Sequence, residues 1–223
     1  MSFVVAIDGP AGSGKGTVTE IISKELGLLN IGSGSAYRCV ALEAIRRGIK
    51  VEETQKIIDI LDEIEIEFKI ENDKDLIYLN GEEVSERIRQ KDVAKIVSPV
   101  SSIKEVRFKL NDIFRKYAEG KAVIMEGRDI GTYVFPNADV KIYLDATIEE
   151  RTKRRYKQNQ EAGIEMTYEE ILQNIKARDK NDMEKEIGAL KQAEEAVYID
   201  SSDMSIEEVV EIISNVILEK RGK

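Results

Sequence analysis

The stretch IDGPAGSGKGT, residues Ile7–Thr17, sets four glycines, one lysine and one threonine between two regular patterns. The residues Phe3–Ile7 are apolar and rich in β-branched side chains, which predicts a strand buried on both faces. After the glycines, apolar side chains recur at helical spacing, which predicts a helix. These side chains are Val18, Ile21, Ile22 and Leu26. A strand, a glycine-rich loop and a helix are therefore expected to follow one another.

This order is the one that a phosphate-binding loop requires, and Gly9-x-x-x-x-Gly14-Lys15 carries its pattern. Glycines let backbone N–H groups turn inward and approach phosphate oxygens closely. The helix that follows points its positive dipole end at the same place, and Lys15 adds a full charge. The pattern has Ser or Thr directly after the lysine, whereas here Gly16 intervenes. Thr17 is therefore the best candidate for a magnesium-binding hydroxyl.

The rest of the chain alternates short apolar runs with helical patterns, which predicts an α/β fold. Three helices are expected to begin at capping boxes, which start at Thr147, Thr167 and Ser205. We expect a parallel five-stranded sheet flanked by helices. Its strands are predicted at Phe3–Ile7, Leu28–Ile31, Ala122–Met125, Val140–Leu144 and Ala196–Ile199.

Two segments depart from this alternation. Residues 64–70 alternate apolar and charged side chains, turn signals follow at Asn72–Asp75 and Asn80-Gly81, and Leu76–Leu79 reads as a second strand. We therefore expect a small antiparallel β insertion over 62–92, set into a core domain of 1–61 and 93–223. Residues 152–187 are charged and helical, which predicts a mobile arm, or lid, within that core.

Composition limits the chemistry. The 223 residues contain 34 Lys and Arg against 43 Asp and Glu, one cysteine and no histidine. A net charge of −9 argues against general binding to nucleic acid or an anionic membrane. Catalysis by histidine and the common histidine-containing zinc sites are excluded. The single cysteine permits no intrachain disulfide and agrees with a cytoplasmic location.

Three polar clusters are candidates for a common site. Residues 32–38 and 125–132 each follow a predicted strand, and ligands in open α/β sheets bind at the carboxyl ends of strands. The third combines residues 151–155 with residues 178–185, where Arg178, Asp182 and Lys185 share one helix face. Each cluster also has an ordinary reading, as a surface charge, a local ion pair or a solvated helix face.

The motifs GPAGSGKGT, SGSAYR, GRDIGT and RxxRR…ARDxxD together resemble bacterial cytidylate kinases, over essentially the whole chain. The resemblance implies a P-loop kinase fold and transfer of the ATP γ-phosphoryl group to CMP or dCMP, with Mg²⁺. It also implies that the β insertion over 62–92 binds the nucleoside monophosphate and that 152–187 is a helical lid.

The resemblance assigns the site residues as follows. The catalytic side chains are Lys15, Arg128 and Arg155. The ATP-binding residues are Gly9, Pro10, Ala11, Gly12, Ser13, Gly14, Lys15, Gly16, Thr17 and Arg154. The substrate-binding residues are Ser33, Arg38, Ser98, Arg107, Arg128, Asp129, Arg178 and Asp182. Magnesium would be held by Thr17 and, through water, by Glu126.

Three positions depart from the family pattern. Gly32 stands where the family has an aspartate, Glu126 stands where it has an aspartate before Gly-Arg, and Lys185 stands where it has a further lid arginine. Lysine keeps the positive charge but loses the bidentate guanidinium fork. These departures bear on metal contacts and fine geometry and leave the reaction class unchanged.

Other functions remain open at this point. The nearest alternative is the same chemistry on another acceptor, namely UMP, AMP, dTMP or a small sugar acid, with Asp129 as base for a hydroxyl acceptor. A nucleotide-dependent switch would have no use for a base-reading insertion, and a nucleic-acid-associated ATPase is opposed by the net charge. We expect a monomer whose partners are the nucleotides ATP and CMP or dCMP, with neither nucleic acid nor membrane.

Overall fold

A computed structural model describes residues 2–72 and 74–222. A parallel five-stranded sheet has the strand order β2-β6-β1-β7-β8, and a separate three-stranded sheet has the order β3-β4-β5. The predicted fold class is confirmed. The large sheet is formed by β1 (Phe3–Asp8), β2 (Leu29–Gly32), β6 (Ala122–Gly127), β7 (Val140–Asp145) and β8 (Val197–Asp200).

Backbone contacts divide the chain into two compact units, which we describe separately. The first unit consists of residues 29–123 together with Ser2, and the second of residues 3–28 and 124–222. The predicted β insertion over 62–92 falls in the first unit, and the predicted lid segment over 152–187 falls in the second. Their assignment as functional domains stays a prediction.

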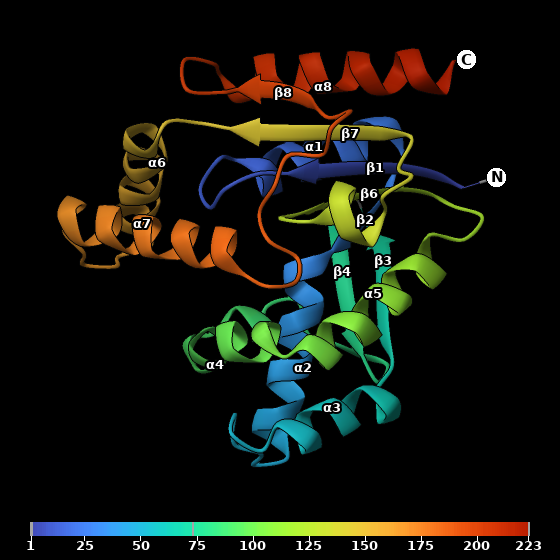
Figure 1. Cartoon of the computed structure of the whole chain (residues 1–223), viewed down its shortest axis with the longest axis vertical. Coiled ribbons are helices and arrows are strands. Elements are labelled where there is room, and N and C mark those ends of the chain that lie inside the picture. Colours follow the sequence, from blue (N-terminus) through green and yellow to red (C-terminus); the bar gives the residue numbers. More distant parts are fainter. Residues whose placement is uncertain (1, 73, 223) are drawn as a thin grey trace. The chain divides into compact units, whose positions relative to one another are not determined.

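In the second unit, β1, β7 and β8 run in parallel, with Val5 opposite Val140 and Asp145 opposite Asp200 (Figure 1). Val5, Ala6 and Ile7 are fully buried, as their apolar run predicts. The helices of this unit include α1 (Lys15–Leu26) and α8 (Ile206–Arg221), which pack against each other. Because parallel strands end at one edge, the segments after Asp8 and Asp145 leave the sheet side by side.

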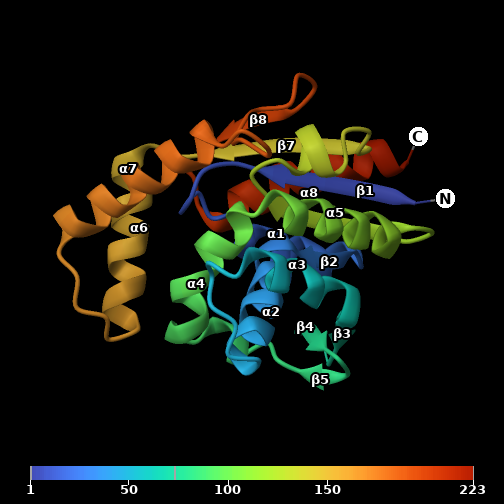
Figure 2. The same cartoon turned by 60° about the horizontal axis from the view of Figure 1, so that its bottom comes forward.

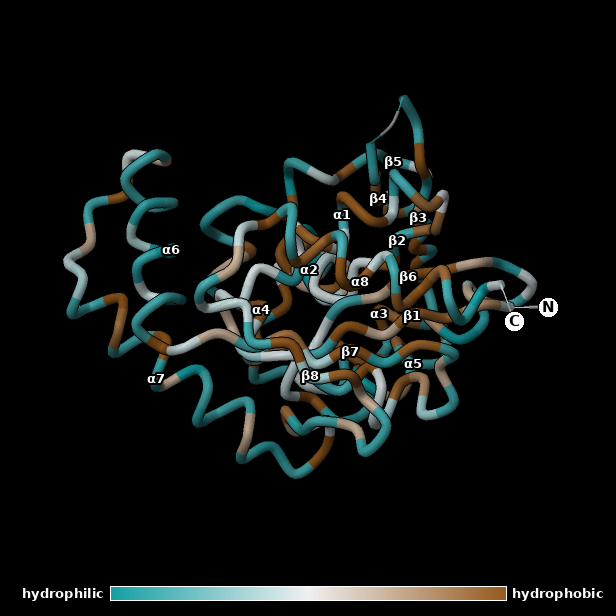
Figure 3. The backbone as a smooth tube through the Cα atoms, turned by 90° about the horizontal axis from the view of Figure 1, so that it is seen from above, coloured by the Kyte–Doolittle hydropathy of each residue, from teal (hydrophilic) through white to brown (hydrophobic). Residues whose placement is uncertain are grey.

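The predicted lid segment is helical and contains two helices that pack against each other, α6 (Ile148–Glu161) and α7 (Tyr168–Glu184). Figure 3 shows this pair mostly in the hydrophilic colour, in agreement with its charged sequence. Thr167 begins α7 with a complete capping box to Glu170, and Ser205 begins α8 in the same way. Thr147 makes only the first half of the box, accepting the Glu150 N–H.

In the first unit, a hairpin packs onto helices. Its strands are β3 (Ile66–Glu71), β4 (Lys74–Leu79) and the short β5 (Glu82–Glu83). Asn80 and Gly81 both have positive φ, at 53° and 78°, which is the type I′ geometry that their sequence predicts. The predicted turn at Asn72–Asp75 includes residue 73, which lies outside the described residues.

The hairpin is held by aromatic contacts with a helix far along the chain. The Phe68 ring lies 6.4 Å from the Phe114 ring and 5.3 Å from the Tyr117 ring, and the Tyr117 hydroxyl accepts the Phe68 N–H at 3.1 Å. Figure 2 shows α2 between α4 and the hairpin. The helical elements of this unit are α2 (Ser33–Arg46), α3 (Thr54–Glu63), η1 (Arg87–Arg89), α4 (Lys91–Ser102) and α5 (Lys104–Ala118).

Among the described residues, no helix has the length and apolar character that crossing a bilayer requires.

Candidate active site

The glycine loop lies between the end of β1 at Asp8 and the start of α1 at Lys15, as its sequence predicts. Gly9, Gly12 and Gly14 have positive φ, of 153°, 83° and 91°. A Cβ atom on Gly9 would lie only 2.0 Å from the Leu144 carbonyl oxygen at the end of β7. Glycine is required at this position because both the backbone angle and the neighbouring strand exclude a side chain.

Lys15 folds back over the loop and is only 4% exposed. Its Nζ donates to the Pro10 carbonyl at 2.7 Å and to the Ser13 hydroxyl at 3.2 Å. Burial, reinforced by the positive charge of Arg128, lowers the pKa of Lys15 to about 7, although the charges of Glu126 and Asp8 act in the opposite direction. The loop therefore contains a buried ammonium group that is poised to gain from a negative ligand.

Arg128 is bound to the predicted lid. Its Nε donates to Asp182 Oδ2 at 2.8 Å, and Lys185 Nζ donates to Asp182 Oδ1 at 2.9 Å. Burial acts to raise the pKa of Asp182, but Arg128 and Lys185 outweigh it and hold the pKa below its usual value. Arg178 lies at the edge of this group of charges. Its Nε is 3.9 Å from Asp182 Oδ2, and its side chain is 66% exposed.

The two predicted magnesium-related residues also belong to the second unit. Thr17 is exposed in the first turn of α1, two residues after Lys15. Glu126 is half-buried near the end of β6, and its charge raises the pKa of Lys15. Asp129 is buried, and its charge raises the pKa of Asp8. A hydroxyl thus lies on α1, which begins at Lys15, and a carboxylate lies on β6, two residues before Arg128.

The structure separates the two predicted lid arginines. Arg154 reaches the glycine loop, where its Nη1 is 3.5 Å from the Ser13 carbonyl, and it also donates to the Ser201 carbonyl at 2.6 Å. Arg155 is exposed and donates to the Gln158 side chain at 2.8 Å on its own helix. The geometry supports a contact between Arg154 and the donor nucleotide more directly than it supports one from Arg155.

The predicted acceptor residues of the first unit fall on α2, α4 and α5. Arg107 is buried, with its guanidinium carbon 5.8 Å from the Tyr37 ring centre and Nη1 3.5 Å from the Ser101 carbonyl. Arg38 is half-buried and donates to the Ile88 carbonyl at 3.2 Å. Ser33 begins α2, and Ser98 is exposed on α4.

Asp8 is a site residue that the sequence reasoning did not single out. Its carboxylate accepts the Ile130 N–H at 2.8 Å and the Gly131 N–H at 2.7 Å, and so ties the GRDIGT segment to the start of the glycine loop. A single π-helical turn, η2 (Ile130–Val134), begins within that segment. Burial raises the pKa of Asp8 to about 6, against the lowering effect of these two hydrogen bonds. The sequence signal that could have identified Asp8 is its position as an acidic residue directly after the predicted buried strand.

Arg151 and Asp179 were also missed as a pair. Both are buried, and Arg151 Nη1 donates to Asp179 Oδ2 at 2.6 Å. Nothing in the sequence distinguishes Arg151 from the other charged residues of its helix, so only the folded structure identifies it.

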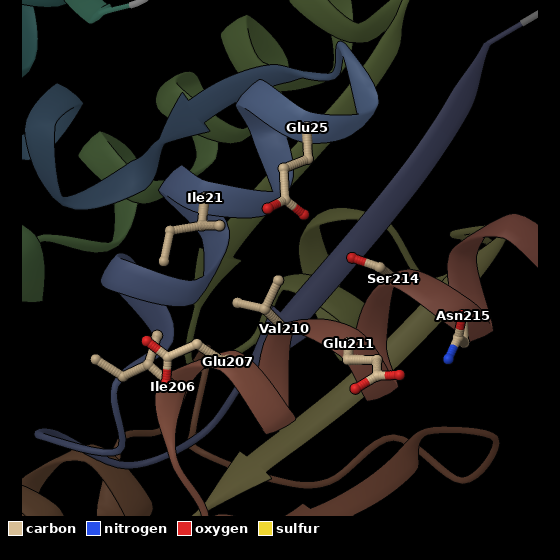
Figure 4. Close-up of a pocket in the computed structure, with 8 residues that line it drawn as sticks. All are labelled: Ile21, Glu25, Ile206, Glu207, Val210, Glu211, Ser214 and Asn215. Atoms are coloured by element: carbon tan, nitrogen blue, oxygen red, sulfur yellow. The ribbon is translucent and has the colours of Figure 1, made fainter.

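A groove of about 340 Å³ between α1 and α8 has a different character (Figure 4). It is lined by apolar side chains and by carboxylates, among them Ile21, Val210, Glu25, Glu207 and Glu211. Among the described residues, no lysine or arginine lines it. A nucleotide phosphate would be repelled here, so we place no nucleotide site in this groove.

The sheet, the glycine loop and the buried Lys15 define a protein of the P-loop nucleotide-binding class. Residues 5–219 match the family model described as cytidylate kinase. The chain belongs to the cytidylate kinase family.

Curated relatives cover nearly the whole chain. The cytidylate kinase of Caldicellulosiruptor saccharolyticus is 48% identical over 207 residues, which cover 93% of this chain and 92% of that protein. The cytidylate kinase of Streptococcus agalactiae serotype V is 45% identical over 213 residues, covering 95% and 94%. A solved structure of an uncharacterized protein from Eubacterium ventriosum is similar with a TM-score of 0.56 at 12% identity, covering 96% of this chain and 98% of that one, and shows the fold alone.

Proposed function

We propose that this protein transfers the γ-phosphoryl group of ATP to CMP and dCMP, giving the nucleoside diphosphates. The observation that carries the proposal is the buried Lys15 in its glycine loop, 4% exposed and electrostatically coupled to Arg128, in a chain of the cytidylate kinase family. A buried cation is stable only if an anion or a strong hydrogen-bond acceptor compensates it, and a nucleotide phosphate is such an anion.

The donor site is assigned to residues 9–17 and Arg154. The backbone N–H groups of the loop and the start of α1 present positive partial charge to the β- and γ-phosphates. Lys15 supplies a full charge to the same oxygens. Arg154 lies against the Ser13 carbonyl, which supports its role as a further donor-site cation.

Magnesium fits the side chains present. Mg²⁺ is usually held by one or two carboxylates, substrate phosphates and water rather than by a cage of protein ligands. Thr17 and Glu126 offer a hydroxyl and a carboxylate, both hard oxygen ligands, on α1 and β6 respectively. When bound, the ion would neutralise charge on the transferring phosphoryl group.

We assign acceptor-binding roles to Ser33, Arg38, Ser98 and Arg107 within the first unit. Within the second unit we assign such roles to Arg128, Asp129, Arg178 and Asp182. The arginines suit the acceptor phosphate, because guanidinium groups bind phosphate bidentately. Asp129 can accept a hydrogen bond from the cytosine amino group, which would favour cytosine over a base lacking that donor.

The chemistry needs positioning and charge neutralisation more than a base. The attacking atom is a phosphate oxygen that is already anionic near neutral pH, so the absence of histidine is no obstacle. The main barriers are repulsion between anions and their alignment, and Lys15 and Arg128 act on both. Closure of the lid, residues 152–187, would exclude water from the bound nucleotides and so prevent hydrolysis of ATP.

The wider context is proposed on the same basis. We assign to the protein nucleotide partners of low molecular mass, a monomeric state and a cytoplasmic location, with neither nucleic acid nor a membrane as a partner. Size-exclusion chromatography with light scattering tests the monomeric state directly.

The experiment that tests the function is an ADP-release assay of the purified protein with ATP and magnesium across CMP, dCMP, UMP, AMP and dTMP. We expect the highest kcat/KM for CMP or dCMP. The Lys15→Gln variant, purified identically, is the matched control for contaminating kinases and should be inactive. Equal rates across all bases would remove the cytosine assignment, and activity that persists in Lys15→Gln would remove the donor-site assignment.

A further inference from the structure

Arg151 connects three separate segments of the second unit. Its Nε donates to the Ala146 carbonyl after β7 at 2.9 Å, and its Nη1 donates to the Ala11 carbonyl in the glycine loop at 3.0 Å. The same Nη1 donates to Asp179 Oδ2 on α7 at 2.6 Å. One guanidinium group therefore joins the phosphate loop, the end of a core strand and a lid helix.

The contact with the loop is close and directional. A Cβ atom on Gly12 would lie 3.3 Å from the Arg151 Cβ, so the loop rests directly on this residue. In a trans peptide the C=O and N–H groups point in opposite directions. Because the Ala11 carbonyl points at Arg151, the Gly12 N–H points away from Arg151. Arg151 thus sets the orientation of one of the N–H groups that are available to a phosphate.

The ion pair is buried, and on one side it is incompletely satisfied. Arg151 is 6% exposed and Asp179 is 8% exposed. Among the described residues, Asp179 Oδ1 is a buried oxygen without a hydrogen-bond partner. A buried ion pair with an unsatisfied oxygen is costly compared with apolar packing, so its value to the protein is more readily functional than stabilising.

Asp179 also has a particular place on α7. It precedes Asp182 by three residues, and Asp182 is the residue that binds Arg128 and Lys185. Residues three apart lie on neighbouring parts of one helix face. The contacts of Asp179 with Arg151 and of Asp182 with Arg128 therefore hold the same stretch of α7 at two points.

We propose that Arg151 and Asp179 are positioning residues that couple occupation of the phosphate loop to the position of the lid helix α7. The inference rests on the proposed donor site in this loop. A phosphate that engages the Gly12 N–H fixes the Ala11–Gly12 peptide, and the Ala11 carbonyl then holds the Arg151 guanidinium. Arg151 in turn holds Asp179, and so the segment of α7 that carries Arg178 and Asp182.

The test compares Asp179→Asn with Glu184→Gln. The asparagine is isosteric and removes the charge of the buried pair. Glu184→Gln removes the charge of an exposed α7 residue that lies 4.0 Å from Lys180, so it is a matched control for a loss of charge on this helix. Hydrogen exchange of the α7 amides is measured for each protein without and with saturating ADP, together with the Kd for ADP by calorimetry.

In the wild type and in Glu184→Gln, we expect ADP to slow exchange in α7 about fivefold or more, the lower end of coupling between sites. In Asp179→Asn we expect this protection to fall below about twofold, even at ADP concentrations that saturate the variant. Protection in Asp179→Asn equal to that of the wild type would overturn the proposal. A wild type that binds no ADP would instead overturn the proposed donor site, and the coupling with it.

Arg151→Lys provides a second variant in case Asp179→Asn does not fold. Lysine keeps a charge for Asp179, but its single nitrogen cannot replace the fork that reaches three oxygen atoms. We expect the same loss of ADP-dependent protection in α7. Wild-type protection in a folded Arg151→Lys protein would overturn the proposal on its own.

Discussion

Raising the pH from 7.5 to 9 should weaken binding of ADP by about 20-fold, because the remaining protonated fraction of Lys15 falls by about that factor over this range. Lys15 is 4% exposed, and its pKa is lowered to about 7 by burial and by the charge of Arg128. Only the protonated form carries the charge that a phosphate would engage. Deprotonation therefore removes the main cation of the loop while leaving its backbone N–H groups in place.

The magnitude follows from the titration curve. With a pKa of about 7, Lys15 is about 24% protonated at pH 7.5 and about 1% protonated at pH 9. The ratio of these fractions gives the expected change in Kd. The nucleotide itself contributes little, since the second pKa of a phosphate is about 6 and ADP is already ionised across the range. Asp8, with a pKa of about 6, is likewise mostly ionised throughout.

The direction of proton exchange on ADP binding can be measured independently of the affinity. A bound phosphate raises the pKa of Lys15, so the complex holds a proton that the free protein lacks. Calorimetric titration at pH 7.5, in buffers of different ionisation enthalpy, should therefore report an uptake of about 0.8 proton per ADP bound. At pH 6 the uptake assigned to Lys15 should fall to about 0.1, because the free lysine is already charged there.

Lys15→Arg is the matched control. Arginine stays protonated at every accessible pH, so the variant should bind ADP with an affinity that barely changes between pH 7.5 and 9. A wild-type Kd that is constant over this range, with no proton uptake at pH 7.5, would refute the assignment of Lys15 as a buried cation of low pKa. A dependence that survives in Lys15→Arg would assign the titration to another group.

Three further predictions address the acceptor, the loop and a helix start. Arg128→Ala should lower kcat with CMP by about a hundredfold or more while the Kd for ADP changes little, and normal turnover of CMP would contradict the role of Arg128. Gly9→Ala should lower the free energy of unfolding by roughly 4 kcal/mol or more, because the added Cβ would lie 2.0 Å from the Leu144 carbonyl oxygen. A Tm close to that of the wild type would contradict the loop geometry. Ser205→Ala should cost about 1 kcal/mol in urea unfolding through loss of the α8 cap, and an unchanged midpoint would contradict that contribution.

The strands of the large sheet and the starts of α6, α7 and α8 could be predicted to within a residue or two because they rest on local patterns. The apolar run at Phe3–Ile7 became β1 (Phe3–Asp8), and the capping boxes at Thr167 and Ser205 became the starts of α7 and α8. The Asn80-Gly81 pair became the turn between β4 and β5. Periodicity, capping and turn chemistry act between residues that are neighbours in the sequence, so a single sequence is enough to reveal them.

Part of the candidate site was visible in the same way. The phosphate loop is a continuous motif, and Arg128, Arg178 and Asp182 stood in recognisable clusters. The pairing of Arg128 with Asp182 was not visible, because 53 residues separate the two positions along the chain. A sequence shows that both charges exist, but their contact depends on where β6 and α7 lie in the folded unit.

The sequence by itself determined the alternation of strands and helices, the glycine loop and the membership in a kinase-like class, since each is written in short contiguous patterns. Only the tertiary structure decided that Asp8 holds the backbone of Ile130 and Gly131, and that Arg151 and Asp179 form a buried pair beneath the loop. The physical reason is that burial removes water from these charges and makes their partners obligatory. Burial is a property of the packed chain, and no local pattern encodes it.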